Sequence, residues 1–146
     1  MGRIFGRFRK DEDGASAVEF ALVAAPLIAL LFGSVEFARL YWTDHALTRV
    51  ATEAARCVAI PEAVCSGDGG SLDVGKARSY VERQARSFGL DMASEDIAID
   101  IAAKCSGVDG FVRVTLGYSF TSPVAGLVSR DRAGMRLQAS ACFAAG

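Results

Sequence analysis

The sequence GASAVEFALVAAPLIALLFGSV, residues 14–35, decides the architecture of this chain because it is mostly apolar and carries a single charged residue, Glu19. A helix that spans a bilayer needs roughly 20 mostly apolar residues, and this stretch supplies them. Tyr41 and Trp42 follow, at the place where aromatic residues gather along a membrane–water interface. We therefore predict a transmembrane helix over residues 15–41.

Glu19 stands near the start of that helix, where a charge is costly. Insertion scales give about 2.5–3.5 kcal/mol for a charge at the helix centre and less near an edge. A cut after Gly14 would create a positive amine on Ala15, and that amine on a neighbouring copy would pair with Glu19. The alternative is a carboxylate that reaches back to the headgroup region and has no specific partner.

The charges and cysteines around the apolar run predict its orientation. Basic residues are slightly richer before the run (Arg3, Arg7, Arg9, Lys10) than at a similar distance after it (Arg39, Arg49, Arg56), which favours a cytoplasmic N-terminus. All four cysteines (Cys57, Cys65, Cys105, Cys142) follow the run, which predicts two disulfides in an oxidising compartment. We expect a single-pass protein of a bacterial inner membrane with a periplasmic C-terminal part.

A conventional secretory signal peptide fits this run poorly. Such a signal has a 7–15-residue apolar stretch and a small-x-small cleavage site. The run here is longer, and it continues into residues 36–42, which offer no good site for that cut. An uncut signal anchor remains the alternative to a processed helix.

The residues after the apolar run predict a small α+β head. An amphipathic continuation of the first helix ends at Pro61, and a second helix runs from Ser71, as its N-cap, to Phe88, before Gly89. Strict alternation at Ile97–Ala102, Val112–Phe120 and Met135–Phe143 predicts three antiparallel strands, with Ile97, Ile99 and Ile101 on one face. Asp109-Gly110 is the predicted hairpin turn.

The predicted fold is thus a long N-terminal membrane-spanning helix that continues into a small head, where a second helix packs on a three-stranded antiparallel sheet. The predicted parts are a basic leader (1–14), the transmembrane helix (15–41) and a periplasmic head (42–146). Cys57 and Cys65 are easily bridged, which leaves Cys105 and Cys142. Alternation places this second pair on opposite faces, so it requires a bulge or a strand end, and the other two connectivities stay open.

The segment Gly14-Ala15-Ser16-Ala17-Val18-Glu19-Phe20, with Pro26, Gly33 and Glu36-Phe37 after it, resembles the TadE-like pseudopilins of tight-adherence (Flp) pilus systems. Its core, a glycine and then Glu-Phe after four residues, is similar to the processing site of type IV prepilins. The resemblance covers residues 13–42, and the helix-plus-sheet head is compatible with it.

The resemblance implies a processing site made of Gly14, Ala15, Glu19 and Phe20. A membrane prepilin peptidase would cut between Gly14 and Ala15 on the cytoplasmic side. Glu19 would then neutralise the Ala15 amine of an adjacent subunit, and in apolar surroundings this pair is far better than either charge alone. Glu36 is a second matching carboxylate, to which we assign no function.

The resemblance also implies partners and a role. The partners are the prepilin peptidase, other pilins and pseudopilins, the inner-membrane pilus assembly platform and the lipid bilayer. The head of this chain is sizeable, whereas the major Flp pilins are very short. This difference implies a minor pseudopilin or assembly component that serves adhesion or secretion. The alternative is an uncleaved, single-pass anchored periplasmic domain that binds a partner or scaffolds an envelope complex.

The remaining motifs do not indicate an enzyme. A formal net charge of −1 gives no footprint for nucleic acid. His45 is the only histidine, and the cysteine spacings match no zinc pattern. The stretch GSLDVGK (70–76) fits most of a phosphate-binding loop, but Ala77 stands where Ser or Thr would bind Mg²⁺. We therefore predict no catalytic residue, cofactor or metal.

Overall fold

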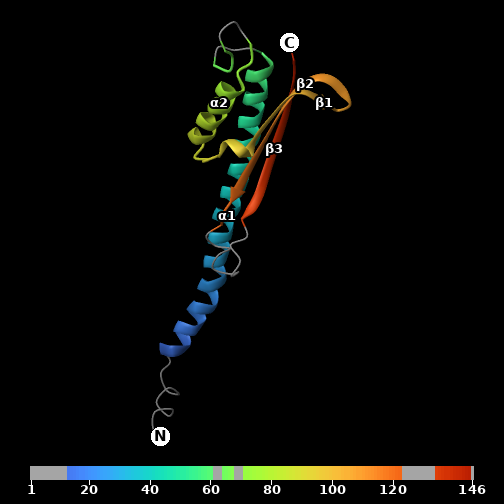
Figure 1. Cartoon of the computed structure of the whole chain (residues 1–146). Coiled ribbons are helices and arrows are strands. Elements are labelled where there is room, and N and C mark those ends of the chain that lie inside the picture. Colours follow the sequence, from blue (N-terminus) through green and yellow to red (C-terminus); the bar gives the residue numbers. More distant parts are fainter. Residues whose placement is uncertain (1–12, 61–63, 68–70, 123–133, 146) are drawn as a thin grey trace. The chain divides into compact units, whose positions relative to one another are not determined.

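The computed structural model describes residues 13–60, 64–67, 71–122 and 134–145. Its elements follow the order α1 (Asp13–Ala59), α2 (Val74–Ser87), the 3-10 turn η1 (Ser94–Asp96), β1 (Ile97–Cys105), β2 (Val108–Phe120) and β3 (Met135–Ala144) (Figure 1). This confirms the predicted α+β fold with a long N-terminal apolar helix. The predicted leader, residues 1–14, lies outside the described residues except for its last two positions.

The chain divides into two compact units, Met1–Ala38 and Arg39–Gly146, and α1 contributes residues to both. In the N-terminal unit the helix runs on through Pro26, although a proline removes one backbone hydrogen bond. In the C-terminal unit the helix ends at Ala59, and the Ile60 N–H still donates to the Arg56 carbonyl at 2.9 Å. Pro61 follows directly in the sequence, as the predicted end of the helix requires.

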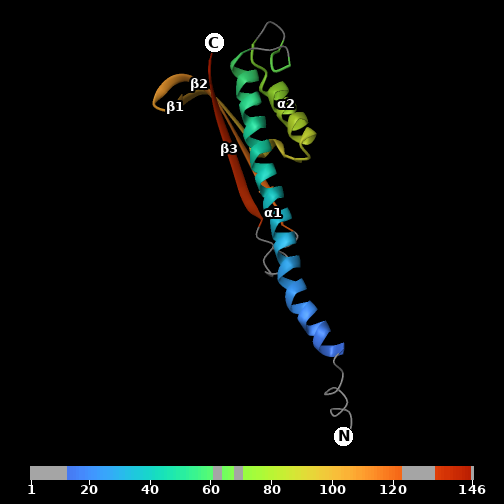
Figure 2. The same cartoon turned by 180° about the vertical axis from the view of Figure 1, so that it is seen from behind.

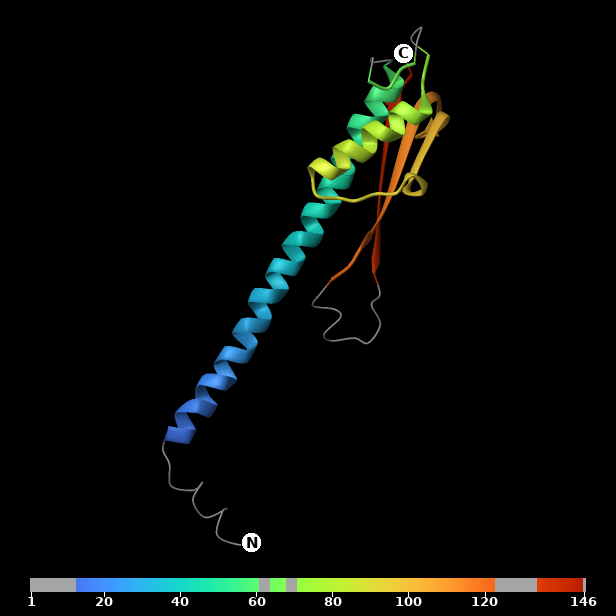
Figure 3. The same cartoon turned by 60° about the vertical axis from the view of Figure 1, so that its left-hand side comes forward.

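The hydrophobic core lies entirely in the C-terminal unit. The residues 39–59 of α1 contribute mostly small or branched side chains, among which Leu47, Val50 and Ala51 are fully buried. The inner face of the sheet contributes Val114 and Leu116, also fully buried. Within this unit, α2 and the sheet flank the α1 segment (Figure 2), and Figure 3 shows α2 crossing in front of it. This arrangement leaves one face of the sheet covered and the other open.

The boundaries of α2 differ from the prediction at one end. The N-cap is Asp73, whose carboxylate accepts from the N–H groups of Gly75 (2.9 Å) and Lys76 (3.1 Å), so the prediction of Ser71 is wrong. Aspartate and serine are comparable N-caps, but the Asp73 carboxylate also complements the positive end of the helix. Gly89 follows the C-terminal end with a φ of 77°, as predicted for a glycine there.

The sheet order is β1-β2-β3, antiparallel throughout, and its first hairpin turns earlier than predicted. Cys105 pairs with Val108, so the turn is Ser106-Gly107, with φ values of 52° and 83°. A two-residue hairpin loop of this kind needs a positive φ at both positions. Asp109-Gly110 instead forms an irregularity within β2, where Gly110 has a φ of 87°.

A bulge in β1 reverses the alternation of its side chains. Between Asp100 and Ala103, β1 has one residue more than the facing part of β2. Ile101 falls in the bulge and is 59% exposed, so its predicted place beside Ile97 and Ile99 is wrong. Beyond the bulge, Cys105 comes to the same face as Cys142.

That reversal permits the second disulfide. The structure joins Cys57 to Cys65 and Cys105 to Cys142, the two pairs favoured by the sequence, and no described cysteine is free. The first disulfide fastens the end of α1 to residues 64–67. The second joins the two outer strands across β2, with a Cα–Cα distance of 6.4 Å.

Candidate membrane and assembly segment

The four predicted processing residues lie in the first two turns of α1. Gly14, Glu19 and Phe20 are exposed, and Ala15 stands four residues before Glu19. Glu19 therefore follows Ala15 by about one helical turn. A Cβ atom added to Gly14 would meet nothing within 4 Å. The described structure therefore gives no packing reason for a glycine at this position.

Glu19 has no neutralising partner among the residues that the structure describes. Among the described residues, neither a hydrogen bond nor an ion pair involves its carboxylate. From Phe20 to Val35 the helix carries no other charged residue. A charge in such surroundings is stable only if it reaches water or meets an opposite charge. The carboxylate is thus available to a group from outside the chain.

The surface around Glu19 is made of large apolar side chains. Phe20 is 75% exposed and Leu30 is 72% exposed, and the most apolar part of the helix has no buried residue. Exposed apolar area on this scale is rare on soluble monomers and marks a membrane or protein contact. Among the described residues, α1 is the one helix long and apolar enough to cross a membrane. These features are consistent with single-pass membrane anchoring.

Small residues recur along this apolar surface. Ala17, Ala21, Ala25, Ala29 and Gly33 are spaced by four residues and are all exposed. Small side chains at that spacing let another helix approach closely in a membrane. The Ser34 hydroxyl donates to the Leu31 carbonyl at 2.9 Å, so this polar group is satisfied within the helix.

The phosphate-loop-like stretch at residues 70–76 and His45, which the sequence analysis did not assign to catalysis, make contacts within the fold. The Asp73 carboxylate occupies the N-terminal amides of α2, the place where a phosphate would have to bind. The Lys76 ammonium donates to the Ser66 carbonyl at 3.0 Å. His45 packs edge-on against Tyr41, with ring centroids 4.3 Å apart, and the described residues contain no His/Cys/Asp/Glu group suited to a metal ion.

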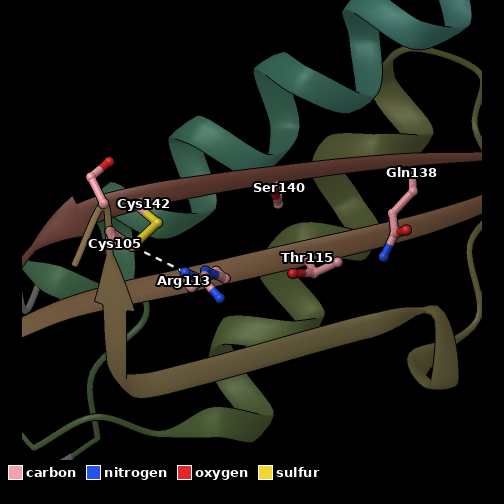
Figure 4. A pocket seen from close by; sticks show the side chains of 7 residues that line it. Cys105, Arg113, Thr115, Gln138, Ser140 and Cys142 are labelled. Atoms are coloured by element: carbon pink, nitrogen blue, oxygen red, sulfur yellow. Dashed lines mark hydrogen bonds between the residues drawn. A yellow bond between two sulfur atoms is a disulfide. The ribbon is translucent and has the colours of Figure 1, made fainter.

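Sequence reasoning missed a shallow polar pocket of about 480 Å³ on the open face of the sheet. Figure 4 shows its lining: the Cys105–Cys142 disulfide beside Arg113, with Thr115, Gln138 and Ser140 along the neighbouring strands. Arg113 donates to the Lys104 carbonyl and lies 3.7 Å from the Cys105 sulfur. The bulge that brings Cys105 to this face has no clear sequence signal, so the pocket was not predictable.

The comparison with protein families matches the part of the chain that carries the apolar segment. The family model described as TadE-like protein matches residues 14–56. The N-terminal segment of this chain is similar to that family. The match begins at Gly14 and continues through the exposed part of α1 into its buried part, and it confirms the resemblance seen in the sequence. Searches among curated proteins and among solved structures gave no match.

Proposed function

We propose that this chain is a minor pseudopilin or assembly component of a bacterial tight-adherence (Flp) pilus system. The observation that carries the proposal is the exposed Glu19 in an apolar helix surface, five residues after Gly14, within the TadE-like segment. The chain would have no catalytic activity of its own. Its part in adhesion or secretion would be to join other subunits through the membrane helix.

The proposed sequence of events begins with insertion into the inner membrane, N-terminus in the cytoplasm. A prepilin peptidase then cuts between Gly14 and Ala15, and the new amine carries a positive charge. Glu19 of one subunit neutralises the Ala15 amine of its neighbour, and the small residues Ala17 and Ala21 permit the close helix approach that this requires. Both charges leave water together, which avoids the penalty of burying either one alone. The assembly platform would receive the processed subunit.

The direct test of processing is the intact mass of the membrane-purified chain, from cells with and without an active prepilin peptidase. The proposal predicts a chain that starts at Ala15 only when the peptidase is active. Gly14→Leu should block the cut, because a peptidase pocket fitted to glycine has no room for a side chain. Gly33→Leu is the matched control, since a Cβ atom there also meets nothing within 4 Å. It should leave the cut intact.

A mature chain that keeps residues 1–14 beside an active peptidase would contradict the proposal. That result would favour an uncleaved, anchored periplasmic domain that scaffolds an envelope complex. Equal processing of the Gly14→Leu chain would contradict the assigned site, because the cut would then lie elsewhere.

A further inference from the structure

The two disulfides of this chain differ in how far they are exposed to water. Cys57 is 3% exposed and Cys65 is 1% exposed, and both belong to the hydrophobic core. In the second disulfide Cys105 is buried, whereas Cys142 is exposed on the open face of the sheet. Thiol–disulfide exchange begins when a thiolate reaches one of the two sulfur atoms. Of the two disulfides, the second therefore offers such a sulfur without opening the core.

Arg113 lies beside the buried half of the second disulfide (Figure 4). Its Nη2 atom is 3.7 Å from the Cys105 sulfur, and the same guanidinium donates to the Lys104 carbonyl. Among the described residues no carboxylate forms an ion pair with this guanidinium. Asp100 pairs with Arg113 across the strands, but its carboxylate accepts from the Ala102 N–H at 3.0 Å. The positive charge of Arg113 thus remains available to the sulfur.

Exposure and charge together give the exchange reaction a direction. An arginine beside a cysteine favours the thiolate form of that cysteine. Exchange is faster when the leaving sulfur is stabilised as a thiolate. Attack on the exposed Cys142 releases Cys105, which is the sulfur that Arg113 contacts. Attack in the opposite sense would have to reach the buried sulfur of Cys105.

A polar pocket opens in front of this disulfide and has room for a molecule that carries the thiol. Its volume of about 480 Å³ lies within the range of roughly 300–1,000 Å³ that is usual for small-molecule sites. Beyond the disulfide and Arg113, it is lined by the side chains of Thr115, Gln138 and Ser140. Within the described part of the chain, these three side chains make no hydrogen bond with one another or with other residues. Their hydroxyl and amide groups can therefore bind polar groups of an incoming molecule.

We propose that Cys142 is a thiol-exchange site at which an external thiolate forms a mixed disulfide. The incoming thiolate attacks the Cys142 sulfur, and a new sulfur–sulfur bond forms as the bond to Cys105 breaks. The electron pair of the broken bond leaves on Cys105 as a thiolate, next to Arg113. The external thiol is oxidised and Cys105 is reduced, so the step needs no other reactant.

This exchange changes the connections of the sheet. The Cys105–Cys142 disulfide joins the outer strands β1 and β3, and the exchange opens that link. It also attaches the incoming molecule covalently to β3. The ligand class is a thiolate, supplied either by a small molecule or by a cysteine of another protein.

The test follows the full-length chain in detergent during incubation with glutathione. Samples are stopped with acid, free thiols are alkylated, and the modified cysteines are located by peptide mass mapping. The proposal predicts a glutathione adduct on Cys142 and an alkylated Cys105. This adduct should form about tenfold or more faster than any adduct on Cys57 or Cys65. An adduct that forms first on Cys105, or equal rates at the two disulfides, would overturn the proposal.

A second arm distinguishes the two sources of the thiolate. It replaces glutathione by a thioredoxin that keeps a single active-site cysteine. An adduct on Cys142 with glutathione alone assigns the pocket to a small thiol, and one with thioredoxin alone assigns it to a protein thiol. Adducts with both support the shared chemistry, and the absence of both would overturn the proposal.

Variants of Arg113 test its part in the reaction. Arg113→Gln should slow adduct formation at Cys142 about threefold or more, because the leaving thiolate loses its cation. Arg113→Lys keeps the charge and should recover part of the rate. Arg136→Gln is the matched control, since this arginine lies on the same face but binds Asp96 at 3.1 Å, and it should react like the parent. An unchanged rate in the Arg113→Gln chain would contradict the assigned role of Arg113.

Two further readouts separate this proposal from changes in folding and in processing. The exchange rate at Cys57–Cys65 should stay the same in all three variants, which shows that the core has not loosened. All three should also still be cut after Gly14, so the exchange site and the proposed processing can fail independently.

Discussion

The N-terminal and C-terminal parts of the single helix α1 differ in which side chains they expose and which they bury. Residues 13–38 expose large side chains such as Phe20 and Leu30, whereas residues 39–59 bury smaller ones such as Val50 and Ala54. The two regions differ in the distribution of charge as well as in side-chain size. Residues 20–35 carry no charged residue, whereas residues 39–59 include five, namely Arg39, Asp44, Arg49, Glu53 and Arg56. An all-round apolar surface with large residues suits lipid, while a one-sided stripe with many alanines suits close packing against α2 and the sheet.

The largest expected difference between the two regions concerns the disulfides, both of which lie in the C-terminal unit. Replacing Cys105 and Cys142 by serine opens a loop of 37 residues and should lower the free energy of unfolding of that unit by about 4 kcal/mol. Replacing Cys57 and Cys65 opens a loop of 8 residues and should cost about 2.5 kcal/mol. Denaturant unfolding of the full chain in detergent, followed by the near-ultraviolet signal, measures both. Equal losses would contradict the loop-length account.

Matched leucine truncations compare the two surfaces directly. Leu47 is completely buried, so Leu47→Ala should lower the free energy of unfolding of the C-terminal unit by roughly 2–5 kcal/mol, through lost burial and the cavity left behind. Leu30→Ala removes the same atoms from an exposed position and should leave that free energy unchanged. The same unfolding experiment measures both variants. Similar losses from both would mean that residues 13–38 also pack within the chain.

A smaller effect is expected at the start of α2. Asp73→Ala removes the acceptor for the Gly75 and Lys76 amides and should cost about 1 kcal/mol of stability. Ser71→Ala, at the N-cap that the sequence suggested, should cost less. If the serine variant proves the more destabilising, the capping arrangement described here is incorrect.

Much of this structure could be predicted because its signals are local. The apolar run, Pro61 and Gly89 mark helix positions directly, and strict alternation marks the three strands. The misplaced features depend on choices between nearby candidates. Ser71 and Asp73 are both good caps, and Ser106-Gly107 and Asp109-Gly110 are both good turns. Only the pairing of β1 with β2 decides between the two turns.

The bulge at residues 101–102 could not be predicted from the sequence either, because it is defined by the pairing of β1 with β2. Ile101 continues a perfect alternation in the sequence, yet its side chain is exposed. The reason is that Ile101 falls in the bulge, which changes the faces to which the side chains of β1 point. The polar pocket on the open face follows from the assembled sheet. The processing segment, in contrast, is contiguous in the sequence, so its residues could be named before the structure was known.

The central claim is that Glu19 remains in an apolar helix surface because the Ala15 amine of another subunit neutralises it. The most direct measurement compares pilus assembly, after insertion and cleavage have been verified, for Glu19→Gln and for the matched variant Glu36→Gln. The account predicts that Glu19→Gln inserts normally but is lost from the assembled structure, while Glu36→Gln assembles like the parent. Full assembly of the Glu19→Gln chain would contradict it.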